Sequence, residues 1–255
     1  MAVLSKLLKY DLRANLKIYL LVWPCIIAFA LLSRLALAAD WHGRAATILT
    51  ATTVTLFILA VIAACAFALI ISIIRFYSGL LRDEGYLMFT LPVRPWQLLL
   101  SKFITAILTI TVTAVISFFS VILVFDGVDG LLTLLKDLLT RMDFPSGLTL
   151  TLIVLLLFFS MCAGILQIYL SCSIGHLFRS KRILWSVLVY YGISMVLEVV
   201  VMIVSIGILG SQTMDLLSAQ SPNVLLGIVA GFEALLCALY FFLSERILRN
   251  HLNLE

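Results

Sequence analysis

Six long apolar runs dominate this sequence of 255 residues and restrict the folds open to it. A helix needs about 20 mainly apolar residues to cross the ~30 Å hydrocarbon core of a bilayer. Each run reaches that length; they cover about 19–39, 46–74, 98–125, 148–174, 183–209 and 222–243. The sequence therefore predicts an all-α polytopic membrane protein with six transmembrane helices, forming one transmembrane domain over residues 1–255.

The overall composition agrees with this fold class. Hydrophobic residues make up 64% of the chain and charged residues only 12%, and the mean hydropathy is +1.21. A soluble domain has an apolar fraction nearer a half and about a quarter charged residues. The lipid bilayer is thus the expected surrounding, and the net charge of +4 indicates membrane topology and not a nucleic-acid partner.

The N-terminal segment combines leucines at helical spacing with Lys6, Lys9, Arg13 and Lys17 on a different face. This pattern predicts an interfacial helix at about 3–17, lying among anionic headgroups. The apolar run that follows is longer than the 7–15 residues of a signal-peptide core. We therefore expect an uncleaved first span.

The distribution of Lys and Arg predicts the orientation, because cytoplasmic segments are enriched in these residues. With the N-terminus inside, thirteen cations fall in cytoplasmic segments and only four, Arg34, Arg44, Lys136 and Arg141, fall outside. We expect a multi-pass protein of the plasma membrane with both termini in the cytoplasm.

The stretch from 82 to 96, between the second and third runs, would then be cytoplasmic. Gly79 and Gly85 can end the incoming helix, and Pro92 and Pro95 prevent one continuous helix on the far side. Residues 86–91 leave room for one or two helical turns.

The chemistry of this short turn favours a protein partner at the membrane surface. Asp83 and Glu84 stand at its N-terminal end, where a helix dipole favours acids, and the turn itself is apolar and aromatic. The alternative is an ordinary turn whose aromatic side chains lie in the headgroup layer.

The stretch Asp83-Glu84-Gly85-Tyr86-Leu87-Met88-Phe89-Thr90-Leu91-Pro92-Val93 resembles the loop between the second and third spans of permease subunits of type-2 ABC transporters, particularly of Gram-positive bacteria. The C-terminal sequence Leu252-Asn253-Leu254-Glu255 is similar to the tail of such permeases. The chain departs from the family pattern at Arg94-Pro95-Trp96.

The resemblance implies a short cytoplasmic coupling helix that docks on a separate ABC ATPase subunit. It also implies a second permease subunit, identical or homologous, so that twelve spans surround the translocation path. The residues that the resemblance would give the ATPase-coupling role are Asp83, Glu84, Gly85, Tyr86, Leu87, Phe89 and Pro92.

Enzymatic motifs are missing from the sequence. There is no G-x-x-x-x-G-K-[ST] phosphate loop, so ATP hydrolysis is expected in a partner subunit. We find no HExxH, GxSxG or CxxC pattern either, and we predict no catalytic residue, metal site or cofactor.

Glu198 and Glu233 are the acids within the fifth and sixth runs. Counted at 1.5 Å per residue, both lie roughly 17–18 Å from the outer ends of their helices, hence at matching depth near the midplane. A charge there costs at least ~2.5 kcal/mol, so such residues should face the bundle interior. They are candidates for the translocation path, or alternatively for a packing role through a shared proton or hydrogen bonds to Ser194 or Tyr190.

Three functions follow from these features. The first is a non-catalytic permease subunit of an ATP-driven exporter. The second is an ion-coupled secondary transporter using Glu198 and Glu233, and the third is a membrane scaffold or sensor that recruits a cytoplasmic partner.

Overall fold

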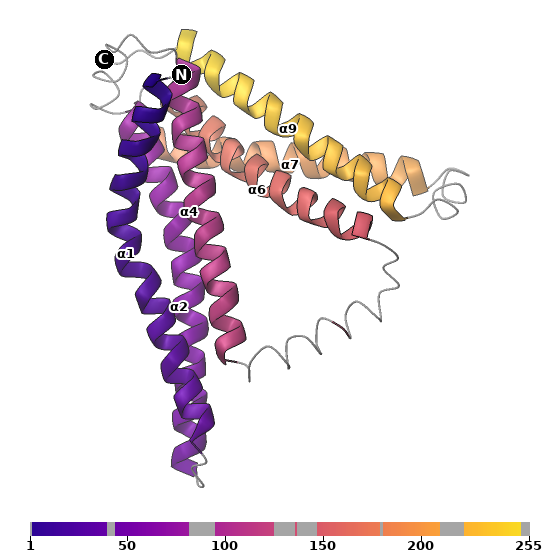
Figure 1. Ribbon diagram of the computed structural model, residues 1–255. Coiled ribbons are helices and arrows are strands. Elements are labelled where there is room, and N and C mark those ends of the chain that lie inside the picture. The colour runs from indigo at the N-terminus through magenta and orange to yellow at the C-terminus, as the bar shows by residue number, and fades with distance from the viewer. Residues whose placement is uncertain are drawn as a thin grey trace. The chain divides into compact units, whose positions relative to one another are not determined.

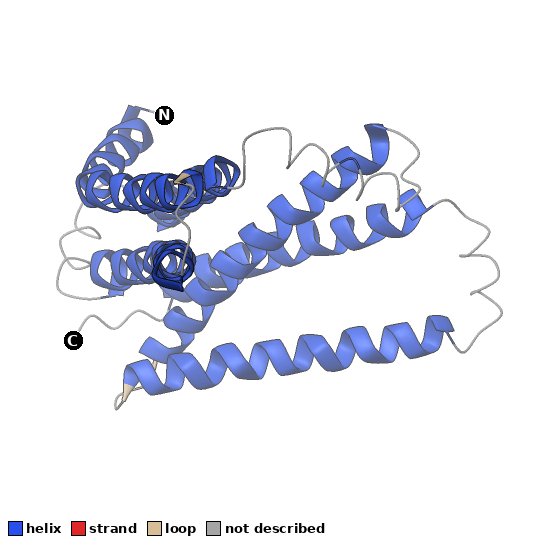
Figure 2. Cartoon of the chain, turned by 90° about the horizontal axis from the view of Figure 1, so that it is seen from below, coloured by secondary structure: helices blue, strands red, loops and turns tan. Residues whose placement is uncertain are grey.

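The computed structural model describes residues 2–39, 44–81, 95–124, 136, 147–178, 181–209 and 222–250. Within these ranges it contains six helices long and apolar enough to cross a membrane, and no strand (Figure 2). They are α1 (Ala2–Ala38), α2 (Arg44–Phe76), α4 (Pro95–Val124), α6 (Gly147–His176), α7 (Arg182–Leu209) and α9 (Pro222–Asn250). Each predicted apolar run coincides with one of these helices, so the all-α fold with six long apolar helices is confirmed.

The chain divides into two compact units. Unit 1 comprises Met1–Ile74 and Leu100–Phe144, and unit 2 comprises Arg75–Leu99 and Pro145–Glu255. The division falls inside α2 and α4, so both helices contribute residues to each unit.

Unit 1 is built from α1, the main part of α2 and most of α4, which run side by side (Figure 1). Its core contains apolar side chains from all three helices: Ile26, Ala30, Phe57, Ala64 and Val124.

Polar contacts set the registers of these helices. In the antiparallel α1–α2 pair, Tyr19 Oη donates to the carbonyl of Ala68 (3.4 Å) and Ser33 Oγ donates to the carbonyl of Thr53 (3.0 Å). In the parallel α1–α4 pair, Trp23 Nε1 donates to Thr113 Oγ1 (3.1 Å).

Helix α1 is a single helix of 37 residues that includes Pro24. At 1.5 Å per residue it is about 56 Å long, well beyond the ~30 Å hydrocarbon core. The prediction of a separate interfacial helix at 3–17 is therefore not confirmed, because α1 continues without a break from that segment into the first span.

Unit 2 is organised around α6, which packs against both α9 and α7 (Figure 1). Helices α6 and α9 are parallel, since Thr149 Oγ1 donates to Asn223 Oδ1 (2.6 Å) and Cys237 Sγ contacts the carbonyl of Phe159 (3.4 Å). Helix α7 returns antiparallel, and Gln167 Nε2 donates to its Ser194 (2.8 Å). Such interhelical hydrogen bonds fix helix register within a membrane.

Candidate functional site

The predicted coupling segment lies outside the described residues. This applies to Asp83, Glu84, Gly85, Tyr86, Leu87, Phe89 and Pro92, and also to the C-terminal tail 251–255. The structure does describe the two helix ends that flank positions 82–94, and these ends define the candidate site.

On the N-terminal side, α2 continues as a π-helix, η1 (Tyr77–Leu81). The expected break at Gly79 is wrong, because the chain stays helical to Leu81 and widens its turn instead. Gly79, Leu80 and Leu81 are all buried. A π-helical turn is rare and is found frequently at functional sites.

Two aromatic contacts hold this end of α2 on α6. The rings of Phe76 and Tyr169 stack with centroids 4.0 Å apart and planes 7° apart, and both residues are almost fully buried. Next along the chain, the Tyr77 ring meets the His176 ring edge-on at 6.0 Å. Aromatic pairs contribute about 0.5–1.5 kcal/mol each beyond the area they bury, so the last turns before residue 82 are firmly attached to α6. We call these four residues the aromatic clamp.

The turn between α6 and α7 lies directly beside the aromatic clamp. A Cβ atom on Gly175 would lie 2.5 Å from the backbone nitrogen of Ser186 and 2.6 Å from its Cα, so only glycine fits there. The rings of Phe178 and Trp185 stack at 4.3 Å, and His176 Nε2 lies 3.4 Å from the Arg182 guanidinium. The two helices therefore form a closely packed hairpin at this end.

On the C-terminal side, Pro95 begins α4, a favoured position because the first turn of a helix needs no N–H from it. Leu98 and Leu99 are buried and cluster with unit 2. Two residues later, Ser101 Oγ (2.9 Å) and Lys102 Nζ (2.6 Å) both donate to the Asp11 carboxylate of α1 within unit 1. Each flank of positions 82–94 is thus fixed to a neighbouring helix.

The structure places the two intramembrane acids differently. Glu198 is exposed on α7, whereas Glu233 is half-buried on α9. The Ser194 hydroxyl donates to the Tyr190 carbonyl (3.0 Å) and accepts from Gln167, so the contact expected between Glu198 and Ser194 is replaced by one from α6.

The acids also differ in level along α6. Glu198 lies one turn beyond Ser194, which contacts Gln167, and Glu233 lies one turn before Cys237, which contacts Phe159. Because α7 is antiparallel to α6 and α9 is parallel to it, both one-turn steps lead toward the N-terminal end of α6. The offset between the two acids along α6 therefore equals the offset between Phe159 and Gln167. These eight residues of α6 span about 12 Å. The expected matching depth is therefore not found when the helices are aligned by their contacts.

Glu233 shares a face of α9 with Cys237, Tyr240 and Ser244, since these positions recur every three to four residues. Cys237 contacts α6, and Tyr240 and Ser244 are buried. Within the described ranges, neither hydroxyl has a hydrogen-bond partner. Glu233 consequently belongs to the face of α9 that turns toward α6.

Sequence reasoning missed the aromatic clamp and the Asp11–Lys102 pair. Asp11 is the only acid among four cations in the first 17 residues, and this was a usable signal for an ion pair. Nothing in the spacing of Phe76 and Tyr169 indicates that they stack, because they lie 93 positions apart.

Comparison with known proteins identifies no relative. No protein-family model matches this chain, and no curated protein or solved structure matches it either.

Proposed function

We propose that this chain is the non-catalytic permease subunit of an ATP-driven ABC exporter. It would pair with a second permease subunit to form the translocation path, and a separate cytoplasmic ATPase would dock on residues 82–94. The plasma membrane location and the cytoplasmic position of both termini belong to the same proposal. The location rests on the resemblance to ABC permeases, and the orientation rests on the distribution of Lys and Arg.

The observation that carries the proposal is the aromatic clamp immediately before the predicted coupling residues. Phe76 and Tyr77 attach the end of α2 to Tyr169 and His176 of α6. A force on the docking segment would pass through η1 to α6, because stacked and buried rings do not slide freely.

From α6 the displacement would reach α7 through the hairpin at Gly175, where the two backbones are in contact range. On the other flank, the pairing of Lys102 with Asp11 links the start of α4 to α1. A single docking event would thereby act on both units. This is the mechanical property that a permease driven by an external ATPase needs.

The ion-coupled alternative is less well supported. A proton relay between Glu198 and Glu233 needs the carboxylates within hydrogen-bond reach or joined by few waters. Their offset of about 12 Å along α6 and the different burial of the two side chains weigh against such a relay.

Co-purification from the native membrane tests the proposal. We expect an ATP-hydrolysing subunit to remain with the wild-type chain and to be lost from the Glu84→Ala/Tyr86→Ala variant. A Phe76→Leu variant should retain the ATPase but lose transport, because it weakens transmission and not docking. Transport that persists without any ATPase, or an ATPase that stays bound to the double variant, would contradict the proposal.

A further inference from the structure

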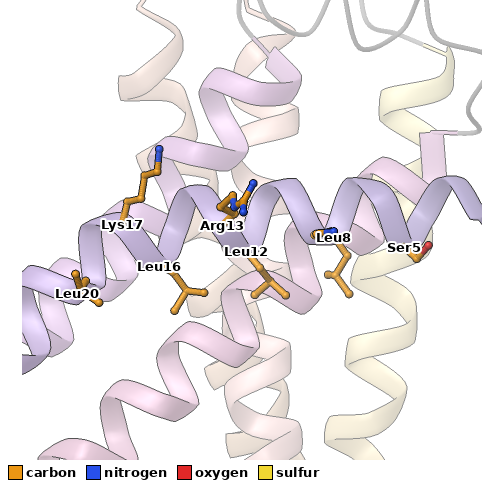
Figure 3. A pocket seen from close by; sticks show the side chains of 8 residues that line it. Ser5, Leu8, Leu12, Arg13, Leu16, Lys17 and Leu20 are labelled. Atoms are coloured by element: carbon orange, nitrogen blue, oxygen red, sulfur yellow. The ribbon is translucent and has the colours of Figure 1, made fainter.

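The first turns of α1 carry an open groove of about 630 Å³, and the described residues that line it all belong to that helix. Figure 3 shows leucines projecting from one edge of α1 and Arg13 and Lys17 projecting from the other. The lining residues follow two rows of helical spacing: Leu8, Leu12, Leu16 and Leu20 form one row, and Lys9, Arg13 and Lys17 form the other. A groove with one apolar and one cationic edge fits an amphipathic ligand that carries a negative charge.

The charge of this groove is not compensated within α1. Asp11 is the only acid among the first 20 residues, and its carboxylate is occupied by Lys102 and Ser101 of α4. Lys9, Arg13 and Lys17 have no ion pair within the described part of the chain. The pairing of Asp11 therefore fixes the rotation of α1 and leaves its cationic row available to an anion.

The order of the two rows along the helix matches the polarity of a phospholipid. The cationic row ends at Lys17, whereas the apolar row extends to Leu20, where the side chain is 72% exposed. The two rows run side by side from Leu8 to Lys17, and the apolar row alone continues to Leu20, in the direction in which α1 continues without a break into the first apolar span. A phosphate on Arg13 and Lys17 would place the attached acyl chain along Leu16 and Leu20.

We propose that the α1 groove binds one anionic phospholipid of the inner leaflet, with its phosphate on Arg13 and Lys17 and an acyl chain along Leu16 and Leu20. The inner leaflet is the one that carries the negative surface potential. The assignment depends on the predicted orientation of the N-terminus and does not depend on the ATPase partner.

Lipid retention by the full chain tests the site. The protein is purified in nanodiscs of equimolar phosphatidylcholine and phosphatidylglycerol, released into detergent, and its bound lipids are measured by native mass spectrometry. We expect the wild type to retain phosphatidylglycerol preferentially. Each cation near an anionic surface contributes about 1 kcal/mol, so Arg13→Gln/Lys17→Gln should weaken this preference by about 30-fold.

Matched variants separate this result from a general effect of charge or of misfolding. Lys181→Gln/Arg182→Gln removes two cations at the α6–α7 turn and should retain the preference, as should the charge-conserving variant Arg13→Lys/Lys17→Arg. Excess glycerol phosphate should not displace the lipid, because it lacks the acyl chain that the leucines contact.

Three results would overturn the assignment. The first is equal phosphatidylglycerol retention in the wild type and in Arg13→Gln/Lys17→Gln. The second is complete displacement by glycerol phosphate, which would leave a headgroup site alone. The third is an Arg13→Gln/Lys17→Gln variant that keeps its lipid but dissociates from an oligomer to a monomer in size-exclusion chromatography, which would assign the groove to a second copy of the chain.

Discussion

Phe76, the last α-helical residue of α2, stacks face to face on Tyr169 of α6, with ring planes only 7° apart. Phe76 is fully buried and Tyr169 is 1% exposed. This pair lies within unit 2 and attaches the last residues of α2 to α6, shortly before the predicted coupling segment.

The stacking energy of this pair can be measured directly. In a double-mutant cycle with Phe76→Leu and Tyr169→Leu, we expect a coupling free energy of about 0.5–1.5 kcal/mol, measured by unfolding in mixed detergent micelles. Phe118→Leu is the matched control, because Phe118 is 52% exposed and should change the unfolding free energy by no more than about 0.5 kcal/mol. A coupling energy near zero would show that the rings do not support each other.

Gly175→Ala should open the α6–α7 hairpin, because the new methyl group meets the backbone nitrogen and Cα of Ser186 as well as its Oγ, and the backbone atoms cannot rotate away. We expect a loss of about 1–3 kcal/mol in the unfolding free energy. Ser186→Ala should not restore it.

Gly164→Ala and Gly192→Ala are the matched controls for the hairpin. Neither new methyl group would have a neighbour within 4 Å, so both variants should be neutral, or more stable by about 0.5–1 kcal/mol from the gain in helix propensity. If Gly175→Ala is as stable as these controls, the close approach of the two helices is wrong.

The ion pair between Asp11 and Lys102 should be worth more than a surface pair, since the side chains are only 15% and 10% exposed, respectively. Lys102→Met leaves Asp11 partly buried without its cation, and we expect a loss of about 2–3 kcal/mol. Lys17→Met, which removes a cation with no ion pair in the described part of the chain, should have an effect within about 0.5 kcal/mol.

A variant that exchanges the two charges tests whether the ion pair itself stabilises the protein. The variant Asp11→Lys/Lys102→Asp should recover part of the stability that Lys102→Met loses. Equal stability of all these variants would mean that the pair does not fix the rotation of α1.

Glu198→Gln and Glu233→Gln should act independently on any transport activity. Sites separated by more than about 7–10 Å without shared partners give additive effects within about 0.5 kcal/mol, and the offset of these acids along α6 is about 12 Å. Transport rates of the wild type, the two single variants and the double variant form a double-mutant cycle that measures the coupling free energy between the two acids. A coupling free energy of more than about 1 kcal/mol would contradict this prediction and would show that the two carboxylates share one site.

The six helices could be predicted because each depends on local composition alone. A run of about 20 apolar residues between charged ends must form its backbone hydrogen bonds within one helix, whichever neighbours it acquires. The start of α4 at Pro95 is also a local effect, because proline has no backbone N–H and is tolerated in the first turn of a helix. The end of α2 was predicted less well, because the burial of Gly79 and Leu80 in unit 2 sustains a helical turn that glycine alone would not favour.

The relative levels of Glu198 and Glu233 could not be predicted from the two apolar segments alone. Counting from helix ends gives Glu198 and Glu233 equal depth, yet the contacts of Ser194 with Gln167 and of Cys237 with Phe159 offset them along α6. Helix register is set by side chains on two helices at once. The register of a helix pair therefore cannot be predicted from the sequence of either helix by itself.

The sequence by itself thus determined the fold class, the six spans and the absence of a phosphate loop, since hydropathy and motifs are properties of contiguous residues. Only the tertiary structure decided that the end of α2 is clamped to α6 through Phe76 and Tyr169, and that Asp11 is paired with Lys102. The physical reason is that these relationships arise from packing between residues far apart in the chain, where many pairings are compatible with the same apolar composition.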